Sequence, residues 1–487
     1  MVTTNVERLE GELNEVYNEF FSNEDVKISL IFEEKDGKFV YRVICGERTK
    51  EFSYPATYDG ELERKRFVKR YAKLGLYEFL SELTGKTLPW GALTGIRPTK
   101  LFYQQGADRE RFLKDVMHVS DKKYDILSHI AEAQSAIYEE NDDNVDFFVG
   151  IPLCPTRCQY CSFISAEITP KTPVNEYIEA LCKEISESKK LVENLRSVYV
   201  GGGTPVSIGT ENLKKVLDAI GEVNCEYTVE AGRADCINDE NLKLLKEYGV
   251  TRICVNPQTF CDRTLELIGR KHSGRDVLEK YELAKKYGFD VNMDLIAGLP
   301  LETFGVFRGS LEMAISLKPE NITVHTLCLK KGSKLKELCS RLPEGEVAKM
   351  IDYSGERLLA AGYRPYYLYR QKYMAGNLEN TGYALPGKEC VYNVDVMEEI
   401  ARNVACGANA VSKRIFGKES RIERIGAPKD LHSYITKIDE IIEKKRRLFE
   451  EKADFFGKVF RFGAYFVRIP VLSRKQQEIF KYFLIIL

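Results

Sequence analysis

The first part of the chain alternates apolar and polar residues from 26 to 54. Alternation of this kind places apolar side chains on one face of a strand, and Asp36-Gly37 is a dipeptide that turns a β-hairpin. Residues 60–83 then carry apolar residues at helical spacing. Together with a helical N-terminal stretch, these patterns predict a small α+β domain over residues 1–143, which ends in the polar run 139–143.

Short apolar strands alternate with amphipathic helices in the middle of the chain, from residue 144 to 330. Strands that are separated by helices usually run parallel in one sheet. This spacing fits a doubly wound sheet as well as a β/α barrel. The strands are expected at 145–149, 197–200, 227–230, 252–255, 290–295 and 321–326.

The residues that follow these strands favour the barrel. A cysteine-rich loop follows the first strand, the run 201–205 (GGGTP) follows the second, and Glu230, Gln258 and Asp294 lie at or after the ends of later strands. The carboxyl ends of parallel strands meet at one mouth, where such folds assemble their sites. We therefore predict an α/β fold with a partial (β/α)6 barrel over residues 144–330, followed by a mostly helical C-terminal domain over 331–487.

Composition narrows the functional classes. The 72 Lys and Arg residues nearly balance the 73 Asp and Glu residues, so the global charge does not indicate a nucleic-acid partner. The N-terminus carries acidic residues in place of an apolar signal core, and no apolar span is long enough to cross a bilayer, so we expect a cytoplasmic protein without membrane insertion. The 13 cysteines lack disulfide-like spacing, which fits a reducing compartment.

Three of the cysteines, Cys154, Cys158 and Cys161, form a Cys-x3-Cys-x2-Cys run. Three thiolates on one loop can hold three irons of a 4Fe-4S cluster and leave the fourth iron open to a small molecule. The alternatives are a structural zinc site or three unrelated cysteines. Zinc usually takes four protein ligands, and neither a His nor a fourth Cys lies nearby.

The triplet Gly201-Gly202-Gly203 has two readings. Glycines let the backbone approach a ligand closely, so its carbonyl and N–H groups can contact an ammonium or a carboxylate. Such a triplet by itself is more often a tight strand-to-helix turn. It is not a phosphate-binding P-loop, because no Gly-Lys-Ser/Thr follows it.

Four barrel motifs of the chain are CPTRCQYCSF, YVGGGTP, VNPQTF and DLIAGLP. Together they resemble the radical S-adenosylmethionine (SAM) family of oxygen-independent coproporphyrinogen III oxidases, or coproporphyrinogen dehydrogenases, and their heme-chaperone relatives. Two outer stretches, PWGALTGIRPTK and LYRQKYMAGNLENTGYA, resemble the HemZ-type branch. The resemblance covers roughly residues 85 to 440.

The resemblance implies a role for each matching residue. Cys154, Cys158 and Cys161 would ligate the 4Fe-4S cluster. The open iron would chelate SAM, and Gly202 and Gly203 would contact its methionyl amino group. Carboxylates, amides and a guanidinium suit the remaining polar groups of SAM. The cofactor-binding residues implied in this way are Gly202, Gly203, Thr204, Glu230, Gln258, Arg270 and Asp294. Taken singly, each polar residue could equally lie at a solvated strand end or in a surface ion pair.

The sequence also departs from the family pattern. Members with demonstrated oxidase activity carry a Tyr and a His before the first cysteine, where this chain has Phe148 and Gly150. Oxidases often have a further Cys at the position of Phe163. The stretch 376–383 lacks the His and Trp of the chaperone heme motif. A histidine heme ligand is therefore missing at that position.

Two functional classes follow from the resemblance. The first is an enzyme that oxidatively decarboxylates two propionates of coproporphyrinogen III to give protoporphyrinogen IX, with flavodoxin or ferredoxin as an electron donor. The second is a heme- or tetrapyrrole-binding chaperone, and a heme-modifying radical SAM enzyme is a further alternative. The catalytic residues are not identified by the motifs.

The C-terminal domain would cover the substrate in either class. Its tyrosine-rich run 363–373, with Arg364, Arg370 and Lys372, could form a face for a polyanionic tetrapyrrole, and Arg97 and Lys100 supply further cations. The alternative is an aromatic strand that packs on a helix. The apolar end of the chain, about thirty residues long, does not resemble the family.

Overall fold

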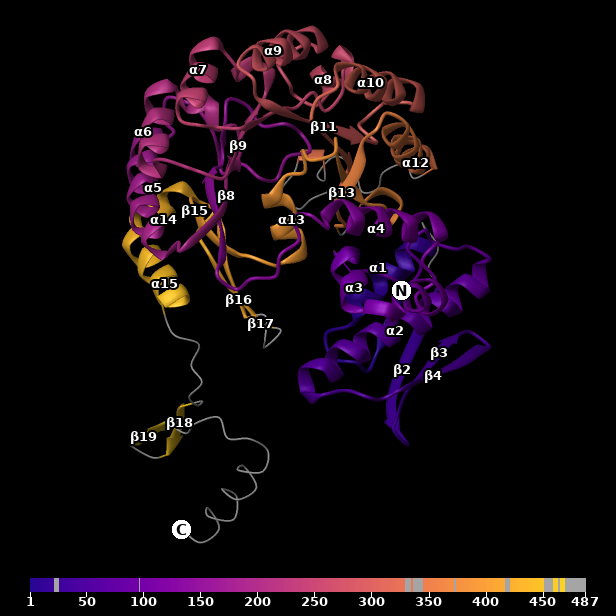
Figure 1. The fold of residues 1–487 in the computed structure, drawn as a ribbon. Coiled ribbons are helices and arrows are strands. Elements are labelled where there is room, and N and C mark those ends of the chain that lie inside the picture. The colour runs from indigo at the N-terminus through magenta and orange to yellow at the C-terminus, as the bar shows by residue number, and fades with distance from the viewer. Residues whose placement is uncertain are drawn as a thin grey trace.

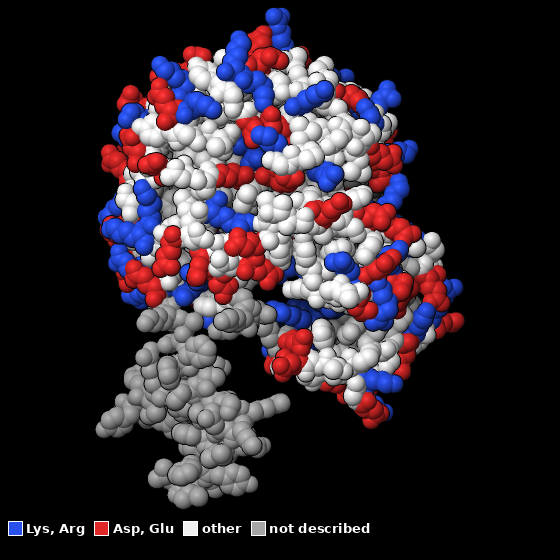
Figure 2. Space-filling model, viewed as in Figure 1, with Lys and Arg blue, Asp and Glu red and all other residues white. Residues whose placement is uncertain are grey.

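The computed structural model describes residues 1–21, 26–95, 97–328, 334–335, 345–371, 374–416 and 421–450, and the backbone of 459–462 and 465–468. Figure 1 shows a large β/α body beside a smaller N-terminal body. None of the helices in these ranges combines the length and the apolar character that a membrane span needs. Figure 2 shows acidic and basic side chains interspersed over the visible face of both bodies.

The N-terminal body contains the predicted hairpin. Strands β2 and β3 pair antiparallel, and Asp36 and Gly37 between them both have a positive φ, 50° and 72°, as a two-residue hairpin turn requires. A four-stranded sheet runs in the order β1-β2-β3-β4, and the long α2 packs on it. Its elements are β1 (Val2–Thr4), α1 (Glu10–Phe20), β2 (Ile28–Lys35), β3 (Lys38–Cys45), β4 (Arg48–Pro55) and α2 (Gly60–Thr84).

A helical segment follows and leads to the barrel. It consists of α3 (Pro98–Gln104), η1 (Gly106–Asp108), η2 (Arg111–Val116) and α4 (Asp121–Gln134). The core of this half includes the buried Trp90, Phe102 and Leu127, and it also takes in Leu368 from much later in the chain. The N-terminal body is therefore joined to the C-terminal part through packing.

The barrel strands lie where the apolar runs predicted them. Runs that are buried on both faces are typical of parallel strands covered by helices, and neighbouring strands from β5 to β12 run parallel in the order β5-β8-β9-β10-β11-β12. The strands are β5 (Asn144–Ile151), β8 (Asn194–Gly202), β9 (Glu226–Gly232), β10 (Arg252–Val255), β11 (Asp290–Ala297) and β12 (Asn321–Thr326). The connecting helices are α5 (Val174–Ser188), α6 (Thr210–Ile220), α7 (Asp239–Glu247), α8 (Asp262–Leu267), α9 (Gly274–Lys286) and α10 (Phe304–Leu317).

Short elements decorate these connections. They are β6 (Leu153–Cys154), β7 (Ala166–Glu167), η3 (Lys189–Leu191), η4 (Pro205–Ile208) and η5 (Ala234–Cys236). The helices surround the strands in Figure 1. The sheet is open, because β5 continues to β15 and β12 to β14. The predicted partial barrel is confirmed.

The C-terminal part adds strands to both ends of the barrel sheet, which then has 11 strands in the order β13-β14-β12-β11-β10-β9-β8-β5-β15-β16-β17. The prediction of a mostly helical domain missed these strands. The tyrosine-rich run forms β13, which confirms the prediction of an aromatic strand there. The elements are α12 (Gly345–Ala360), β13 (Arg364–Tyr369), η6 (Ala375–Asn377), β14 (Asn380–Ala384), α13 (Val391–Glu398), β15 (Arg402–Cys406), β16 (Val411–Phe416), β17 (Arg421–Gly426), α14 (Leu431–Thr436), α15 (Ile438–Glu450), β18 (Val459–Phe462) and β19 (Tyr465–Arg468). The domain boundaries at 143 and 330 stay predictions.

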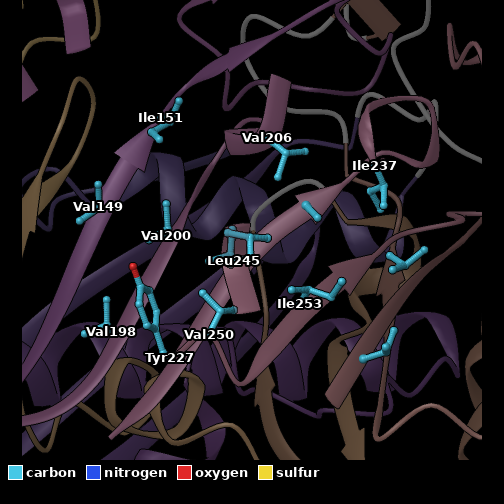
Figure 3. Packing of buried hydrophobic residues seen from close by; sticks show 14 of the residues in the cluster. Val149, Ile151, Val198, Val200, Val206, Tyr227, Ile237, Leu245, Val250 and Ile253 are labelled. Carbon is cyan, nitrogen blue, oxygen red and sulfur yellow. The ribbon is translucent and has the colours of Figure 1, made fainter. Parts of the chain in front are cut away.

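The barrel core is one cluster of buried residues from the strands and the surrounding helices, in which valine, isoleucine and leucine recur. Figure 3 shows Val149, Val198, Val200 and Ile253 on the strands, with Leu245 from α7 packed near them. All of them belong to one cluster of buried residues. Since this core fixes the strands, it also fixes the loops at their carboxyl ends.

Candidate active site

The three cysteines lie on the loop that follows β5 and line one cavity of about 360 Å³. Cys154 ends β6, and its Sγ lies 3.1 Å from the Thr204 Oγ1. Backbone hydrogen bonds hold the loop: the Thr204 N–H donates to the Leu153 carbonyl at 2.8 Å, and the Ile168 N–H donates to the Cys154 carbonyl at 2.8 Å. The predicted neighbourhood of the cysteines and the glycine run is therefore confirmed.

The three thiols fit an iron-sulfur cluster. Each cysteine of such a cluster binds its own iron, and the three cysteines come from one loop and line one cavity. Burial raises the pKa of the Cys154 thiol to about 12, and the Thr204 hydroxyl opposes that rise.

The glycine triplet allows the end of β8 to approach the cysteine loop. A Cβ on Gly203 would lie 2.4 Å from the Leu153 carbonyl oxygen, and one on Gly201 would lie 2.8 Å from the Glu230 carboxyl carbon. Gly202 has a φ of 103°, which favours glycine. Packing therefore excludes a side chain at Gly201 and Gly203, and the positive φ disfavours one at Gly202. A role of the triplet in SAM binding stays a prediction.

Glu230 faces the cavity from β9 and accepts two hydrogen bonds. The Tyr199 hydroxyl donates to its Oε1 at 2.7 Å, and the Gly202 N–H donates to its Oε2 at 3.0 Å. Burial raises the pKa of Glu230 to about 7, although these two donors favour the carboxylate. The negative charge of Asp294 acts with burial, and His325 acts against it. Glu230 is thus poised to gain or lose a proton near neutral pH.

Asp294 is held as a carboxylate on β11. The amide groups of Asn256 and Asn292 donate to its two oxygens at 2.7 and 2.8 Å, and the His325 Nε2 lies 3.7 Å from Oδ1. Burial raises the pKa of Asp294, but His325, Asn292 and Thr323 outweigh it and keep the pKa below its usual value. A fixed negative charge at this position can bind an ammonium or hydroxyl donors.

Gln258 and Arg270 complete this rim. Gln258 has a φ of 64°, its main chain pairs with β11, and its buried Oε1 has no hydrogen-bond partner. Arg270 donates to the Asn256 carbonyl and to the Tyr160 hydroxyl, each at 3.2 Å, and none of the described carboxylates forms an ion pair with it. An unmet acceptor and an unpaired guanidinium beside two carboxylates are complementary to the donors, the ammonium and the carboxylate of SAM.

A wall of tyrosines lines the same cavity. Tyr366, Tyr367 and Tyr369 reach it from β13, on the side opposite the cysteine loop in the sheet order. The rings of Tyr367 and Tyr369 are stacked with centroids 6.4 Å apart, and the Tyr369 hydroxyl lies 3.4 Å from the His325 Nδ1. The wall offers flat apolar contact beside the polar rim.

The cations that the sequence offered for tetrapyrrole carboxylates lie elsewhere. Arg97 and Lys100 form ion pairs with the buried Glu399, which also attracts Lys413 and Arg424. A buried carboxylate is unfavourable unless cations neutralise its charge, so these side chains are engaged by Glu399 and do not line the cavity.

Arg370 and Arg364 do not line the cavity either. Arg370 donates to the carbonyls of Leu93 and Asn377 and lies over the Trp90 ring. Arg364 is exposed at the start of β13. Lys372 lies outside the described residues.

Other cavity residues were missed by sequence reasoning. Arg233, Cys254, Asn292, His325 and Tyr199 all line the cavity. Tyr199 lies two residues before the glycine run, and Arg233 follows the third predicted strand. These places beside the motifs are the signal in the sequence that could have marked both as cavity residues. Cys254 lies inside an apolar run, where a cysteine usually packs as a small apolar residue, so no sequence signal marks it as a cavity residue.

Comparisons with known proteins identify the family. The model of the radical SAM superfamily matches residues 148–314. The oxygen-independent coproporphyrinogen-III oxidase-like protein HemZ of Bacillus subtilis (strain 168) is 36% identical over 430 residues, which cover 83% of this chain and 85% of that protein. The chain belongs to the HemZ-type radical SAM family. Members of this superfamily use a 4Fe-4S cluster and SAM, and the HemZ-type chain retains residues that fit both.

Other relatives of the HemZ-type chain carry a different name. The heme chaperone HemW of Bacillus subtilis (strain 168) is 34% identical over 233 residues, 45% of this chain and 61% of that protein. HemW of Lactococcus lactis subsp. lactis (strain IL1403) is 30% identical over 320 residues, 62% of this chain and 78% of that protein. The solved coproporphyrinogen III oxidase (HemN) from Escherichia coli matches with a TM-score of 0.51 at 20% identity, covering 64% of this chain and 72% of that chain, and this match shows the fold alone.

Proposed function

We propose that the protein oxidatively decarboxylates two propionates of coproporphyrinogen III to vinyl groups, which gives protoporphyrinogen IX. The observation that carries the proposal is the continuity of one cavity from the three cysteines, across the SAM rim, to the tyrosine wall. A cavity of about 360 Å³ lies in the range for small-molecule sites. The proposal also draws on the 36% identity to HemZ.

The residues of the chain divide the work. Cys154, Cys158 and Cys161 hold the cluster, and the rim with Glu230 and Asp294 orients SAM. When bound, the two cofactors would supply a 5'-deoxyadenosyl radical, and we propose a donor such as flavodoxin or ferredoxin for the electron that this takes. After hydrogen abstraction and loss of CO2, an electron acceptor would remove the electron that remains on the substrate. The buried walls exclude water and side reactions from the radical.

The tyrosine wall provides the surface on which a tetrapyrrole would lie. Flat rings pack on pyrrole rings through apolar contact, and the hydroxyl of Tyr369 is polar enough to meet a propionate. Because the cavity is at the small end of its class, the rest of a tetrapyrrole must extend beyond it.

Phe148 and Gly150, which differ from the oxidase pattern, both pack closely against neighbouring groups. The Phe148 ring stacks near Tyr199 and Tyr392, with centroids 6.3 and 6.1 Å away. A Cβ on Gly150 would lie 3.1 Å from the Phe148 ring and 3.2 Å from the Cys406 carbonyl oxygen. A side chain at Gly150 would therefore require the Phe148 ring and the Cys406 carbonyl to move by a few tenths of an ångström. Tyr199 of β8 lies opposite Phe148 of β5 and brings a hydroxyl group to the cavity.

A second candidate function is heme or tetrapyrrole binding as a chaperone, or modification of heme. The observation in its favour is that Arg97, Lys100, Arg364 and Arg370 do not line the cavity, so the described residues supply few cations for four propionates. The relatives named heme chaperone HemW also favour it.

One assay separates the two candidates. The anaerobically reconstituted protein is incubated with SAM, a reductant and coproporphyrinogen III, and the porphyrinogen products and released CO2 are measured by mass spectrometry. The oxidase proposal predicts the divinyl product, with one CO2 released for each vinyl group that forms. Cleavage of SAM without CO2, together with binding or conversion of heme, would favour the second candidate. The cluster-free variant Cys158→Ala is the control.

A further inference from the structure

Arg233 occupies a position between the SAM rim and the cysteine loop. It follows β9 directly, starts the short helix η5, and lines the cavity with only 3% of its surface exposed. A buried guanidinium is costly unless its N–H groups and its charge are compensated. Its partners therefore indicate why it is there.

The two sides of the guanidinium have different partners. Nε and Nη2 donate to the two carboxylate oxygens of Asp235 at 3.0 and 2.7 Å, which is the bidentate geometry of a strong ion pair. Nη1 donates to Thr156 twice, to its hydroxyl at 2.8 Å and to its carbonyl at 3.2 Å. Thr156 lies between Cys154 and Cys158. Arg233 thus ties the cysteine loop to the end of β9.

Asp235 is itself anchored from a third segment. The His272 Nδ1 lies 3.4 Å from its Oδ1, just before α9 begins. The Thr156 hydroxyl donates in turn to the Gly269 carbonyl at 3.5 Å. The cation is therefore held in one place by a network that spans the loops after β9 and β10.

A fixed cation in the wall of the cavity that the three cysteines line acts on electron transfer. Reduction adds a negative charge to a cluster whose cysteine ligands are already negative, and net charge and hydrogen bonding near the cluster set its potential. A nearby guanidinium stabilises the reduced form more than the oxidised form, whereas the carboxylate of Asp235 has the opposite effect.

We propose that Arg233 is a positioning residue that fixes the cysteine loop through Thr156 and raises the reduction potential of the cluster, with Asp235 as its counter-charge. The inference rests on the cluster at Cys154, Cys158 and Cys161 and does not depend on which tetrapyrrole is the substrate. It concerns the ease with which the cluster accepts an electron.

The test is a redox titration of the reconstituted protein without SAM, followed by electron paramagnetic resonance of the reduced cluster. Arg233→Met should lower the midpoint potential, by on the order of a tenfold change in the reduced-to-oxidised ratio, or about 59 mV for a one-electron couple. Asp235→Asn can keep one of the two hydrogen bonds from Arg233, through its amide oxygen, but removes the counter-charge, so it should raise the midpoint. The control is Arg275→Met, which removes an exposed arginine on α9 that pairs with Glu279 and should leave the midpoint unchanged.

Opposite shifts support the proposal, because a purely structural role would move both variants in the same direction or in neither. Equal midpoints for Arg233→Met and the wild type would overturn it. If Arg233→Met fails to hold a cluster, Arg233→Lys is measured instead. This variant keeps the positive charge but loses the paired N–H groups of the guanidinium. A midpoint near that of the wild type, with faster loss of iron, supports both parts of the proposal. A midpoint for Arg233→Lys that falls well below the wild type refutes the role of the charge. A wild-type protein that binds no iron would instead refute the cluster assignment itself.

Discussion

The hydrogen bond from Tyr199 to Glu230 makes a quantitative prediction about SAM binding. Tyr199→Phe removes the hydroxyl that donates to Glu230 at 2.7 Å and keeps the ring that stacks on Tyr392. The lost bond stabilised the carboxylate form. The pKa of Glu230, which burial has already raised to about 7, should therefore rise further in the variant.

The size of the shift follows from the strength of the bond. A hydrogen bond to a charged group contributes about 1.5–3 kcal/mol, and each pKa unit corresponds to about 1.4 kcal/mol, so the pKa should rise by about 1–2 units. Glu230 is protonated below its pKa and ionised above it. If SAM binds the ionised form, affinity increases as the pH rises through the pKa. At pH ~7 the variant should then bind SAM roughly five- to fiftyfold more weakly, and it should recover at a pH above ~9.

The assay is equilibrium binding of SAM to the reconstituted protein between about pH 5.5 and 9.5. The wild type should show an inflection near pH 7, which follows from the pKa of Glu230. Glu230→Gln should show weak binding without this inflection. Tyr392→Phe is the matched control, because the Tyr199 hydrogen bond remains. An inflection at the same pH in Tyr199→Phe and in the wild type would refute the reasoning.

Further variants test the rim, the glycine triplet and the ion cluster. Asp294→Ala should keep the cluster but weaken SAM binding by about 1–3 kcal/mol in a calorimetric titration, and unchanged affinity would remove Asp294 from the site. Gly203→Ala should lower the iron content per chain, because its Cβ would lie 2.4 Å from the Leu153 carbonyl oxygen, whereas Gly309→Ala, with nothing within 4 Å, should not. Equal iron in both variants would contradict the role of the triplet. Glu399→Gln leaves four cations without their carboxylate and should lower the free energy of unfolding by about 3–5 kcal/mol in chemical denaturation, and a loss of SAM affinity at unchanged stability would contradict this structural role.

The barrel was predictable because its signals are local. A strand that is buried on both faces leaves a continuous apolar run, and the cysteine loop, the glycine run and Glu230 lie at or just after the end of such a run. The predicted strand at 290–295, for example, lies within the observed β11 (Asp290–Ala297). Cys154 and Gly203 could be placed together from sequence because both belong to loops at the carboxyl ends of neighbouring strands.

The remaining features depend on contacts between distant segments. β15 pairs with β5 although about 250 residues separate them, and no local pattern records that pairing. The ion pairs of Arg97 and Lys100 with Glu399 arise in the same way. A cation in a motif looks available for a ligand until the fold brings a buried carboxylate to it. The tyrosines of β13 were recognisable as an aromatic strand, but the face that they present depends on its pairing with β14.

The most direct test of the account is reductive cleavage of SAM. The wild-type protein, reconstituted with iron and sulfide under anaerobic conditions and reduced with dithionite, should convert SAM to 5'-deoxyadenosine and methionine. Cys154→Ala, Cys158→Ala and Cys161→Ala, prepared in the same way, should form neither product, since each removes a thiol that lines the shared cavity. Formation of 5'-deoxyadenosine by all three variants at the rate of the wild type, or its absence from a wild-type protein that carries a full cluster, would contradict the account.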